Sequence, residues 1–137
     1  MPTFPVEPGF HHVALRVRDF DKSLALYAQH FGFTPRIAWG EAPKRAVIMA
    51  MGNGAHLELF ERPEQSPPEQ EGTILHICVP SRDVDACAAA AKSLGLKVTM
   101  EPKDVAIANS VTGKPAPVRI CFIEGYDGES IEFFDEK

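Results

Sequence analysis

The stretch HHVALRVRDFD (residues 11–21) has a counterpart later in the chain, HICVPSRDVD (residues 76–85). In both stretches a histidine, His12 or His76, stands before an alternating apolar run, and an Arg-Asp-x-Asp cluster follows at the same spacing. One polar residue at the head of a strand is ordinary. The same residue at the same offset in two halves of a chain indicates two related modules that use it as a pair.

Each stretch predicts a strand followed by a helix. Residues 10–16 alternate as a half-buried strand does, and the acidic cluster after them supplies helix N-caps. After His76 the cap is Asp83 or Asp85. Glycine ends both helices, as is common at C′ positions. The apolar stripes with helical spacing are Leu24, Tyr27, Ala28 and Phe31, ended by Gly32, and Val84, Cys87, Ala88, Ala91 and Leu94, ended by Gly95.

Three strand-like segments follow each predicted helix. In the first half Asn53-Gly54 is a strong signal for a two-residue hairpin, and in the second half residues 126–128 form the matching turn. Each half is therefore expected to be a βαβββ module, which makes the chain an α+β protein. The segments are FTPRIAW (33–39), KRAVIMAM (44–51) and AHLELFE (55–61), then LKVTME (96–101), VRICFIE (118–124) and SIEFFDE (130–136).

The expected organisation is one domain over residues 1–137, with modules at 8–62 and 73–136. Between them residues 63–72 are rich in Pro, Glu and Gln, bury little, and are predicted to be a linker. Residues 102–118 look irregular, and we expect a binding loop or lid there.

Composition narrows the function classes. The net charge is −5, and the basic residues form no stripe along the chain. Both features argue against nucleic acid and anionic membranes as partners and favour a small molecule. No apolar run approaches the roughly 18 residues of a membrane span, and the start of the chain lacks a signal-peptide pattern, so we expect a cytoplasmic protein. Three cysteines without a CxxC pair fit a reducing compartment.

His12 and His76 open the first strand of each module, while Glu58 and Glu132 interrupt apolar runs in the last strand. Singly, each residue has an ordinary explanation, an edge histidine or a glutamate on a solvated strand face. Burying an unpaired carboxylate costs several kcal/mol, so it calls for a cation, a hydrogen-bond network or a proton. Two carboxylates and two imidazoles at corresponding positions favour one divalent metal ion, with Zn, Ni, Co, Mn and Fe(II) all compatible.

These segments resemble the vicinal oxygen chelate (VOC) superfamily, which includes glyoxalase I, extradiol dioxygenases, and fosfomycin- and bleomycin-resistance proteins. The resemblance spans residues 10–134 and implies that the two modules form an open, cup-shaped β-barrel around a metal, usually in a homodimer. It also implies that His12, Glu58, His76 and Glu132 occupy the four metal-binding positions of the glyoxalase I type. Glu58 and Glu132 are then the candidate catalytic bases.

A complete set of four ligands is similar to glyoxalase I and implies a lyase or isomerase that transfers a proton next to a metal-bound oxygen. One alternative is an Fe(II) extradiol-type dioxygenase that uses His12, His76 and Glu132, with Glu58 displaced. Another is a non-catalytic binding protein for a small molecule such as a drug or antibiotic. The turn before Glu132 departs from the glyoxalase I pattern, so the resemblance does not imply glutathione as a co-substrate.

Residues that share a strand face with the ligands are candidates for substrate contacts. Arg16 alternates onto the face of His12 and is placed to hold a substrate carboxylate, or to form a rim salt bridge. His11 is expected to point the opposite way from His12, and Cys78 the same way as His76. The predicted substrate-binding residues are Arg16, Arg119, Phe60 and Phe134. Whether each site is completed within one chain or across the dimer stays open, and we favour one chain.

Overall fold

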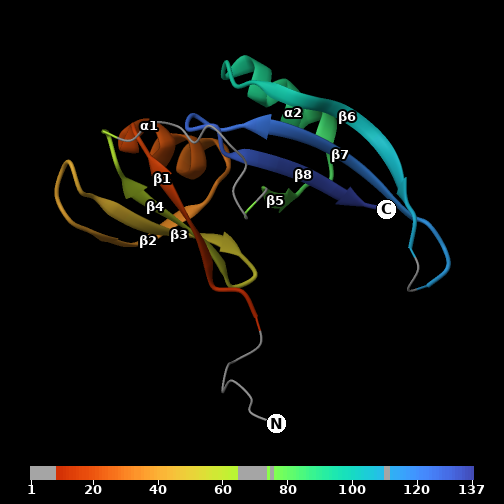
Figure 1. The fold of residues 1–137 in the computed structure, drawn as a ribbon, viewed down its shortest axis with the longest axis horizontal. Coiled ribbons are helices and arrows are strands. Elements are labelled where there is room, and N and C mark those ends of the chain that lie inside the picture. The colour runs from red at the N-terminus through yellow and green to blue at the C-terminus, as the bar shows by residue number, and fades with distance from the viewer. Residues whose placement is uncertain (1–8, 65–73, 75, 110–111) are drawn as a thin grey trace, which may run out of the picture. The chain divides into compact units, whose positions relative to one another are not determined.

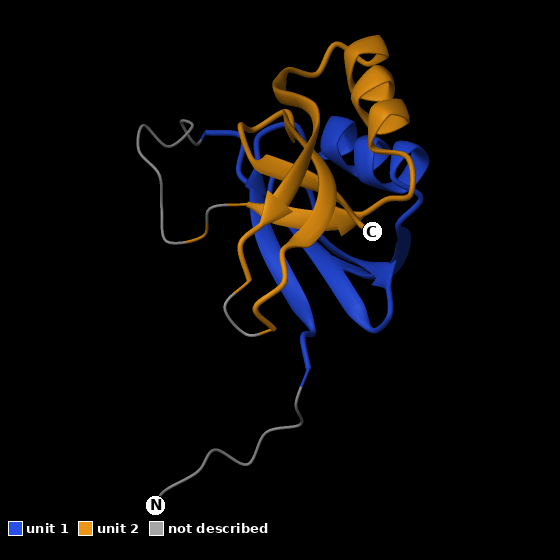
Figure 2. Cartoon of the chain, turned by 90° about the vertical axis from the view of Figure 1, so that its right-hand side faces the viewer, with its two compact units in different colours: residues 1–65 blue, residues 66–137 orange. Residues whose placement is uncertain are grey.

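The structure, a computed structural model, describes residues 9–64, 74, 76–109 and 112–137. The chain divides into two units, residues 1–65 and 66–137, shown in different colours in Figure 2. This division falls inside the stretch 63–72 that the sequence predicts as a linker, most of which lies outside the described residues.

Unit 1 is a βαβββ module (Figure 1). Its sheet has the strand order β1-β4-β3-β2, with β1 parallel to β4 and the other neighbours antiparallel. The predicted order of elements is confirmed, although the helix ends in a π-helical turn that the sequence pattern did not indicate. The elements are β1 (His12–Val17), α1 (Phe20–Ala25), the π-helical turn η1 (Leu26–His30), β2 (Thr34–Trp39), β3 (Ala46–Gly52) and β4 (Ala55–Glu61).

Unit 2 repeats this arrangement with the strand order β5-β8-β7-β6, and β5 is parallel to β8. Both units are thus four-stranded mixed sheets with a helix after the first strand, which confirms the predicted α+β class. The elements are β5 (Ile77–Pro80), α2 (Val84–Ser93), β6 (Val98–Ile107), β7 (Ala116–Glu124) and β8 (Ser130–Glu136). None of the helices in the described ranges is long and apolar enough to cross a membrane.

Both helices begin at the predicted acidic clusters. The side chain of Asp19 accepts a hydrogen bond of 3.0 Å from the backbone N–H of Lys22, and Asp83 accepts one of 3.0 Å from Ala86. Of the two candidates in the second cluster, Asp83 is therefore the N-cap, while Asp85 lies in the first turn of α2. Such caps satisfy backbone N–H groups that have no partner within the helix.

The alternation of β4 separates two different environments. Leu57 and Leu59 are fully buried on one face. Leu26 and Tyr27 in η1 are buried as well. Each leucine contributes roughly 1.5–3 kcal/mol by leaving water. Glu58 therefore points to the opposite face, because successive side chains of a strand alternate. Packing on the apolar face thus fixes which way the glutamate points.

The prediction of an irregular loop over residues 102–118 is wrong. β6 continues to Ile107 and β7 begins at Ala116, and the two strands pair from Lys103 opposite Ile120 to Ile107 opposite Ala116. The register shifts between Met100 and Lys103, so the intervening proline sits at an irregularity where a missing N–H is tolerated. Only residues 108–115 separate the strands.

The predicted hairpin between β3 and β4 is confirmed. Asn53 and Gly54 have φ values of 54° and 79°. Two consecutive positive values are typical of a type I′ turn, which asparagine and glycine adopt most readily. This turn sets the register that places Glu58 opposite Ile48.

Candidate metal-binding site

The first histidine and glutamate meet within unit 1. The parallel pairing of β1 with β4 sets Ala14 opposite Glu58. His12 is two residues before Ala14, so its side chain lies on the same face of the sheet as the Glu58 carboxylate. His12 Nε2 lies 3.6 Å from Glu58 Oε1. Glu58 is buried, with 7% of its surface exposed, whereas the His12 side chain is 40% exposed. Among the described residues, His12 is the ion-pair partner of this carboxylate.

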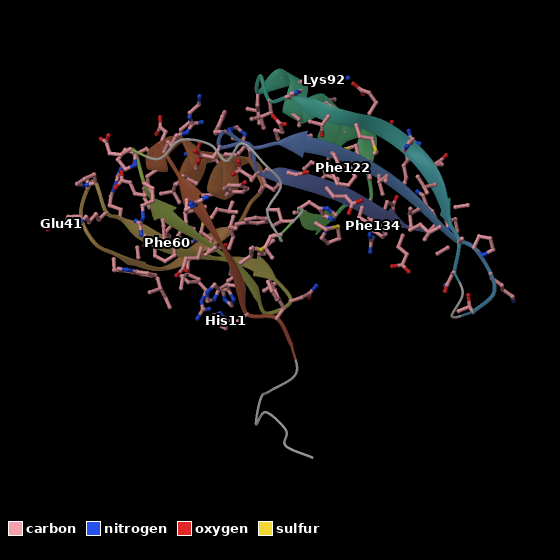
Figure 3. All side chains as sticks on the ribbon, in the orientation of Figure 1. His11, Glu41, Phe60, Lys92, Phe122 and Phe134 are labelled. Atoms are coloured by element: carbon pink, nitrogen blue, oxygen red, sulfur yellow. The ribbon has the colours of Figure 1, made fainter. Side chains whose placement is uncertain are left out.

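The second pair repeats this geometry within unit 2. Cys78 lies opposite Glu132 in the parallel register, and His76 stands two residues before Cys78. His76 Nε2 lies 3.3 Å from Glu132 Oε1, and Glu132 is buried with 9% of its surface exposed. The ring of Phe122, labelled in Figure 3, packs edge-on against the His76 ring at a centroid distance of 5.3 Å. The repeat in the sequence is therefore also a repeat in side-chain geometry.

The separations between nitrogen and oxygen are close to those expected for two ligands of one metal ion. A direct charge-assisted hydrogen bond would be about 2.7–2.9 Å long, which is shorter than either pair. Two atoms that each lie about 2.1 Å from one ion, at a bond angle of 90–110°, are about 3.0 to 3.4 Å apart. The values of 3.3 and 3.6 Å lie at and just beyond the upper end of this range. Imidazole nitrogen and carboxylate oxygen are donors suited to a divalent transition metal.

His11, which the sequence predicted to point away from His12, instead contacts it. His11 Nδ1 lies 2.9 Å from His12 Nδ1, and the two rings meet nearly at right angles. The expectation failed because strand alternation applies only from His12 onward, where β1 begins. A metal-binding histidine commonly donates its second ring N–H to a neighbour, and His11 Nδ1 is placed to accept that proton.

Two further residues hold His11 in place. The Nδ1–H of His56 donates to the backbone carbonyl of His11 at 2.9 Å, and the two rings stack with centroids 4.6 Å apart. With His56 Nδ1 protonated, its Nε2 accepts from the guanidinium of Arg36 at 2.6 Å. Sequence analysis missed this group because it depends on the pairing of β1 with β4 and on Arg36 from β2. The consecutive histidines His11 and His12 were the one visible signal.

The structure brings each predicted histidine next to the predicted glutamate of its own unit. Neither unit, over the residues that the structure describes, gathers three or more His, Cys, Asp or Glu side chains into a metal-binding group. Each unit thus supplies two of the four predicted ligands.

The predicted substrate-contact residues of unit 1 lie on the face of the glutamate. Phe60 stands two residues beyond Glu58 in β4 and is half-buried. Arg16 lies opposite Phe60 in the parallel register and is exposed. A guanidinium in this position is accessible to a ligand.

In unit 2, Phe134, labelled in Figure 3, stands two residues beyond Glu132 in β8. Its side chain is half-buried. Cys78 lies beside Glu132, as predicted from its position relative to His76. Desolvation and the Glu132 carboxylate raise the pKa of the Cys78 thiol to about 11. The thiol is therefore protonated at neutral pH and serves as a hydrogen-bond donor to Glu132 rather than as a nucleophile.

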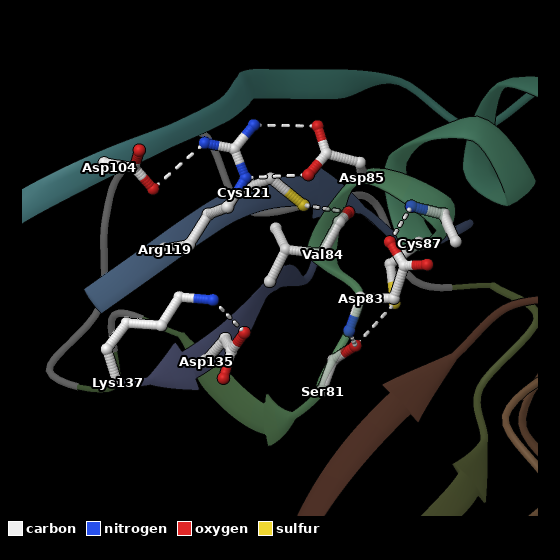
Figure 4. A network of polar contacts seen from close by, with 11 residues as sticks. Ser81, Asp83, Val84, Asp85, Cys87, Asp104, Arg119, Cys121, Asp135 and Lys137 are labelled. Carbon is white, nitrogen blue, oxygen red and sulfur yellow. Dashed lines mark hydrogen bonds and ion pairs between the residues drawn. The ribbon is translucent and has the colours of Figure 1, made fainter.

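Arg119, the remaining predicted contact, is held in an ion-pair network on the helix side of its sheet (Figure 4). It donates to Asp85 of α2 at 2.7 and 2.8 Å and to Asp104 of β6 at 3.1 Å. These bonds hold the pKa of the Asp85 carboxyl below its usual range. Phe122 of β7 lies opposite Glu132 of β8, so the two side chains share one face of the sheet. Arg119 is three residues before Phe122, and its side chain therefore lies on the other face.

The chain contains two sheets of the same βαβββ topology. Each sheet carries a histidine and a buried glutamate at equivalent positions, and this repeat indicates the class of protein. The chain belongs to the Glyoxalase/Bleomycin resistance protein/Dioxygenase superfamily, whose family model matches residues 9–133. A search of curated proteins found no match.

Solved structures support the fold. A glyoxalase/dioxygenase from Nostoc punctiforme is similar with a TM-score of 0.72 and 20% identity, over 100% of this chain and 99% of that one. The trypanothione-dependent glyoxalase I of Leishmania major has a TM-score of 0.72 and 21% identity, over 95% and 88%. The fosfomycin resistance protein FosX of Listeria monocytogenes, solved with Mn(II) and sulfate, has a TM-score of 0.69 and 16% identity, over 96% and 95%.

Proposed function

We propose that the protein is a metal-dependent lyase or isomerase of the glyoxalase type that moves a proton at a carbon adjacent to a carbonyl or hydroxyl group. The observation that carries this proposal is the repeated pair, His12 with Glu58 and His76 with Glu132. Both nitrogen-to-oxygen separations exceed the about 2.7–2.9 Å that is usual for a charge-assisted hydrogen bond, and they lie at or just beyond the spacing of about 3.0–3.4 Å expected for two ligands of one ion. The four side chains together would hold one divalent cation.

When bound, this cation would supply Lewis-acid polarisation of the substrate's oxygen. The chain's own contribution is a carboxylate, Glu58 or Glu132, that accepts and returns the proton. Both carboxylates are buried, and each lies beside the histidine of its own unit. His11 would keep the second ring nitrogen of His12 protonated, so that Nε2 keeps its lone pair for the cation.

We further propose that the protein acts as a homodimer in the cytoplasm. In unit 1 the strand β2 lies at a free edge of the sheet, and all six of its residues are exposed. Ile37 in this strand is 51% exposed. A second chain that covers this edge would remove an aggregation hazard. The three free cysteines fit a reducing compartment.

Anaerobic reconstitution with Fe(II), Ni(II) or Zn(II) tests the proposed activity. A small panel of 2-oxo and 2-hydroxy acids in D2O would be followed by proton NMR for exchange at the adjacent carbon. We expect metal-dependent exchange that is lost in a Glu58→Gln, Glu132→Gln double variant. Oxygen consumption with a catechol would instead indicate the dioxygenase, and saturable ligand binding without exchange or turnover would indicate a binding protein.

A further inference from the structure

Unit 1 contains a pocket of about 710 Å³ at the end of its sheet. This volume lies within the range of about 300–1,000 Å³ that is usual for small-molecule sites. Its lining includes Trp39, Lys44, Ala46, Phe60, Arg62 and Glu64. Phe60 was predicted as a substrate contact from its strand face, whereas the other lining residues were not singled out by the sequence.

The register of three strands builds the aromatic part of this pocket. Trp39 of β2 pairs with Ala46 of β3, and Ala46 pairs with Phe60 of β4, so the three side chains lie side by side on one face. The Trp39 and Phe60 rings meet edge to face with centroids 6.2 Å apart. Between them Ala46 presents only a methyl group. Two partly covered aromatic rings above a small residue form a slot suited to a planar ring.

A guanidinium stands beside this slot in a fixed position. The backbone N–H of Arg62 donates to the carbonyl of Val17 at 2.8 Å, and its side chain donates to the carbonyl of Glu61 at 2.7 Å. The guanidinium carbon lies 5.4 Å from the centroid of the Phe60 ring. One of its five N–H groups is therefore engaged, and others are available to bind a carboxylate in a forked geometry.

The charges around the pocket favour an anion. Lys44 and Arg62 are both exposed lining residues with positive charge. The Glu61 carboxylate is already paired with the Arg45 guanidinium, at 2.6 and 2.9 Å, on the other side of the strand. Glu64 remains as one unneutralised negative charge among the lining residues. Lys44 and Arg62 are thus the two cationic lining residues placed to bind an anion, with Glu64 as the opposing charge.

We infer that this pocket binds an aromatic carboxylate, with its ring between Trp39 and Phe60 and its carboxylate on Arg62 and Lys44. The inference rests on the proposed function, because it names the substrate class of the same site. Phe60 follows Glu58 by two residues on one strand face, a distance of about 6.6 Å. A substrate with an aryl group and an acidic group thus reaches from the pocket to the His12 and Glu58 pair.

Trp39 is the chain's one tryptophan, so its fluorescence reports directly from the pocket. Protein stripped of metal with EDTA would be titrated with 3-phenylpropionate, and with propionate and 3-phenylpropylamine as controls that lack the ring or the negative charge. We expect a saturable change in emission with 3-phenylpropionate, at concentrations at least about tenfold below those needed for either control. The indole N–H signal in the NMR spectrum should shift along the same binding curve.

Variants identify the residues responsible. Arg62→Gln should weaken binding about tenfold, because a charge-assisted hydrogen bond is lost. Ala46→Leu should abolish binding by filling the slot, and Lys97→Gln, an exposed lysine in unit 2, should leave it unchanged. Equal affinity for propionate or the amine, or full affinity in folded Arg62→Gln protein, would overturn the inference.

The same titration separates this inference from the proposed function. His12→Ala in metal-free protein should bind 3-phenylpropionate as the unaltered protein does. If the aromatic acid binds and no metal can be loaded, the proposed function fails while the pocket assignment stands. If metal loads and supports exchange while 3-phenylpropionate does not bind, the pocket assignment fails alone.

Discussion

His11 Nδ1 lies 2.9 Å from His12 Nδ1, while His12 Nε2 faces Glu58 Oε1 at 3.6 Å. One proton must lie between the two Nδ1 atoms, since two lone pairs would repel each other. If His12 donates it, His12 Nε2 carries a lone pair toward Glu58 and is ready to bind a cation. In that arrangement His11 would select the tautomer of His12 that a metal site requires.

This relationship predicts that His11→Ala weakens metal binding without abolishing it. Loss of a group that orients a metal ligand typically lowers affinity 10- to 100-fold. Affinity would be measured by competition with a chromophoric chelator, which does not depend on turnover. His11→Asn, whose side-chain oxygen also accepts a hydrogen bond, should recover part of the loss. His30→Ala, which removes an exposed histidine elsewhere in unit 1, serves as the control. Equal metal affinities in His11→Ala, His11→Asn and His30→Ala would contradict the role of His11.

Removal of a predicted ligand should have a larger effect. Glu58→Gln and His76→Ala should each sharply lower the metal content, because the remaining ligands are left incompletely paired. Metal per chain would be measured by mass spectrometry after desalting, with Glu64→Gln as a control for loss of an exposed glutamate. Unchanged stoichiometry in both ligand variants would rule out the set of four.

Mixing two inactive chains tests how the units are shared. We predict a homodimer by sedimentation, with His12, Glu58, His76 and Glu132 supplied by one chain to each site. Glu58→Gln chains mixed with Glu132→Gln chains should then regain neither metal nor activity, since every chain carries a damaged ligand set. Recovery of roughly half the sites would show that each site is shared between chains, and a monomer would contradict the dimer.

The ion pair between Arg45 and Glu61 predicts a dependence of stability on pH. Hydrogen bonds from Arg45 hold the pKa of the Glu61 carboxyl below its usual range. A carboxyl whose pKa is lower in the folded state stabilises the fold above its unfolded pKa of about 4.3 and loses this contribution as pH falls through its folded pKa. The melting temperature should fall on acidification, and Arg45→Met should lower it at pH 7 and flatten the acid dependence. An acid dependence as steep in Arg45→Met as in the unaltered protein would count against this account.

The sequence was sufficient for the order of elements and for the two histidine and glutamate pairs. These features follow local rules, since strand alternation sets the face of Glu58 and acidic caps start the helices. The strand β4 has the predicted bounds, 55–61. Its alternating apolar residues and the Asn53-Gly54 turn before it both predict this strand, so the local pattern and the fold agree there.

The remaining features depend on contacts between distant segments. The continuation of β6 through Lys103 and Ile107 is enforced by pairing with β7, which overrides a local sequence rich in loop-forming residues. The slot between Trp39 and Phe60 exists because Ala46 lies between them in register. No local pattern indicates which strands become neighbours, so neither feature was predictable from spacing alone.

X-ray absorption spectroscopy of the nickel-loaded protein tests the central claim most directly, because it identifies the atoms bound to the metal. We predict a first shell of nitrogen and oxygen at about 2.1 Å, with outer-shell scattering from two imidazoles and no sulfur at the distance of about 2.3 Å typical of thiolate. Fewer than two imidazoles, or a sulfur ligand such as Cys78, would contradict a site built from His12, Glu58, His76 and Glu132.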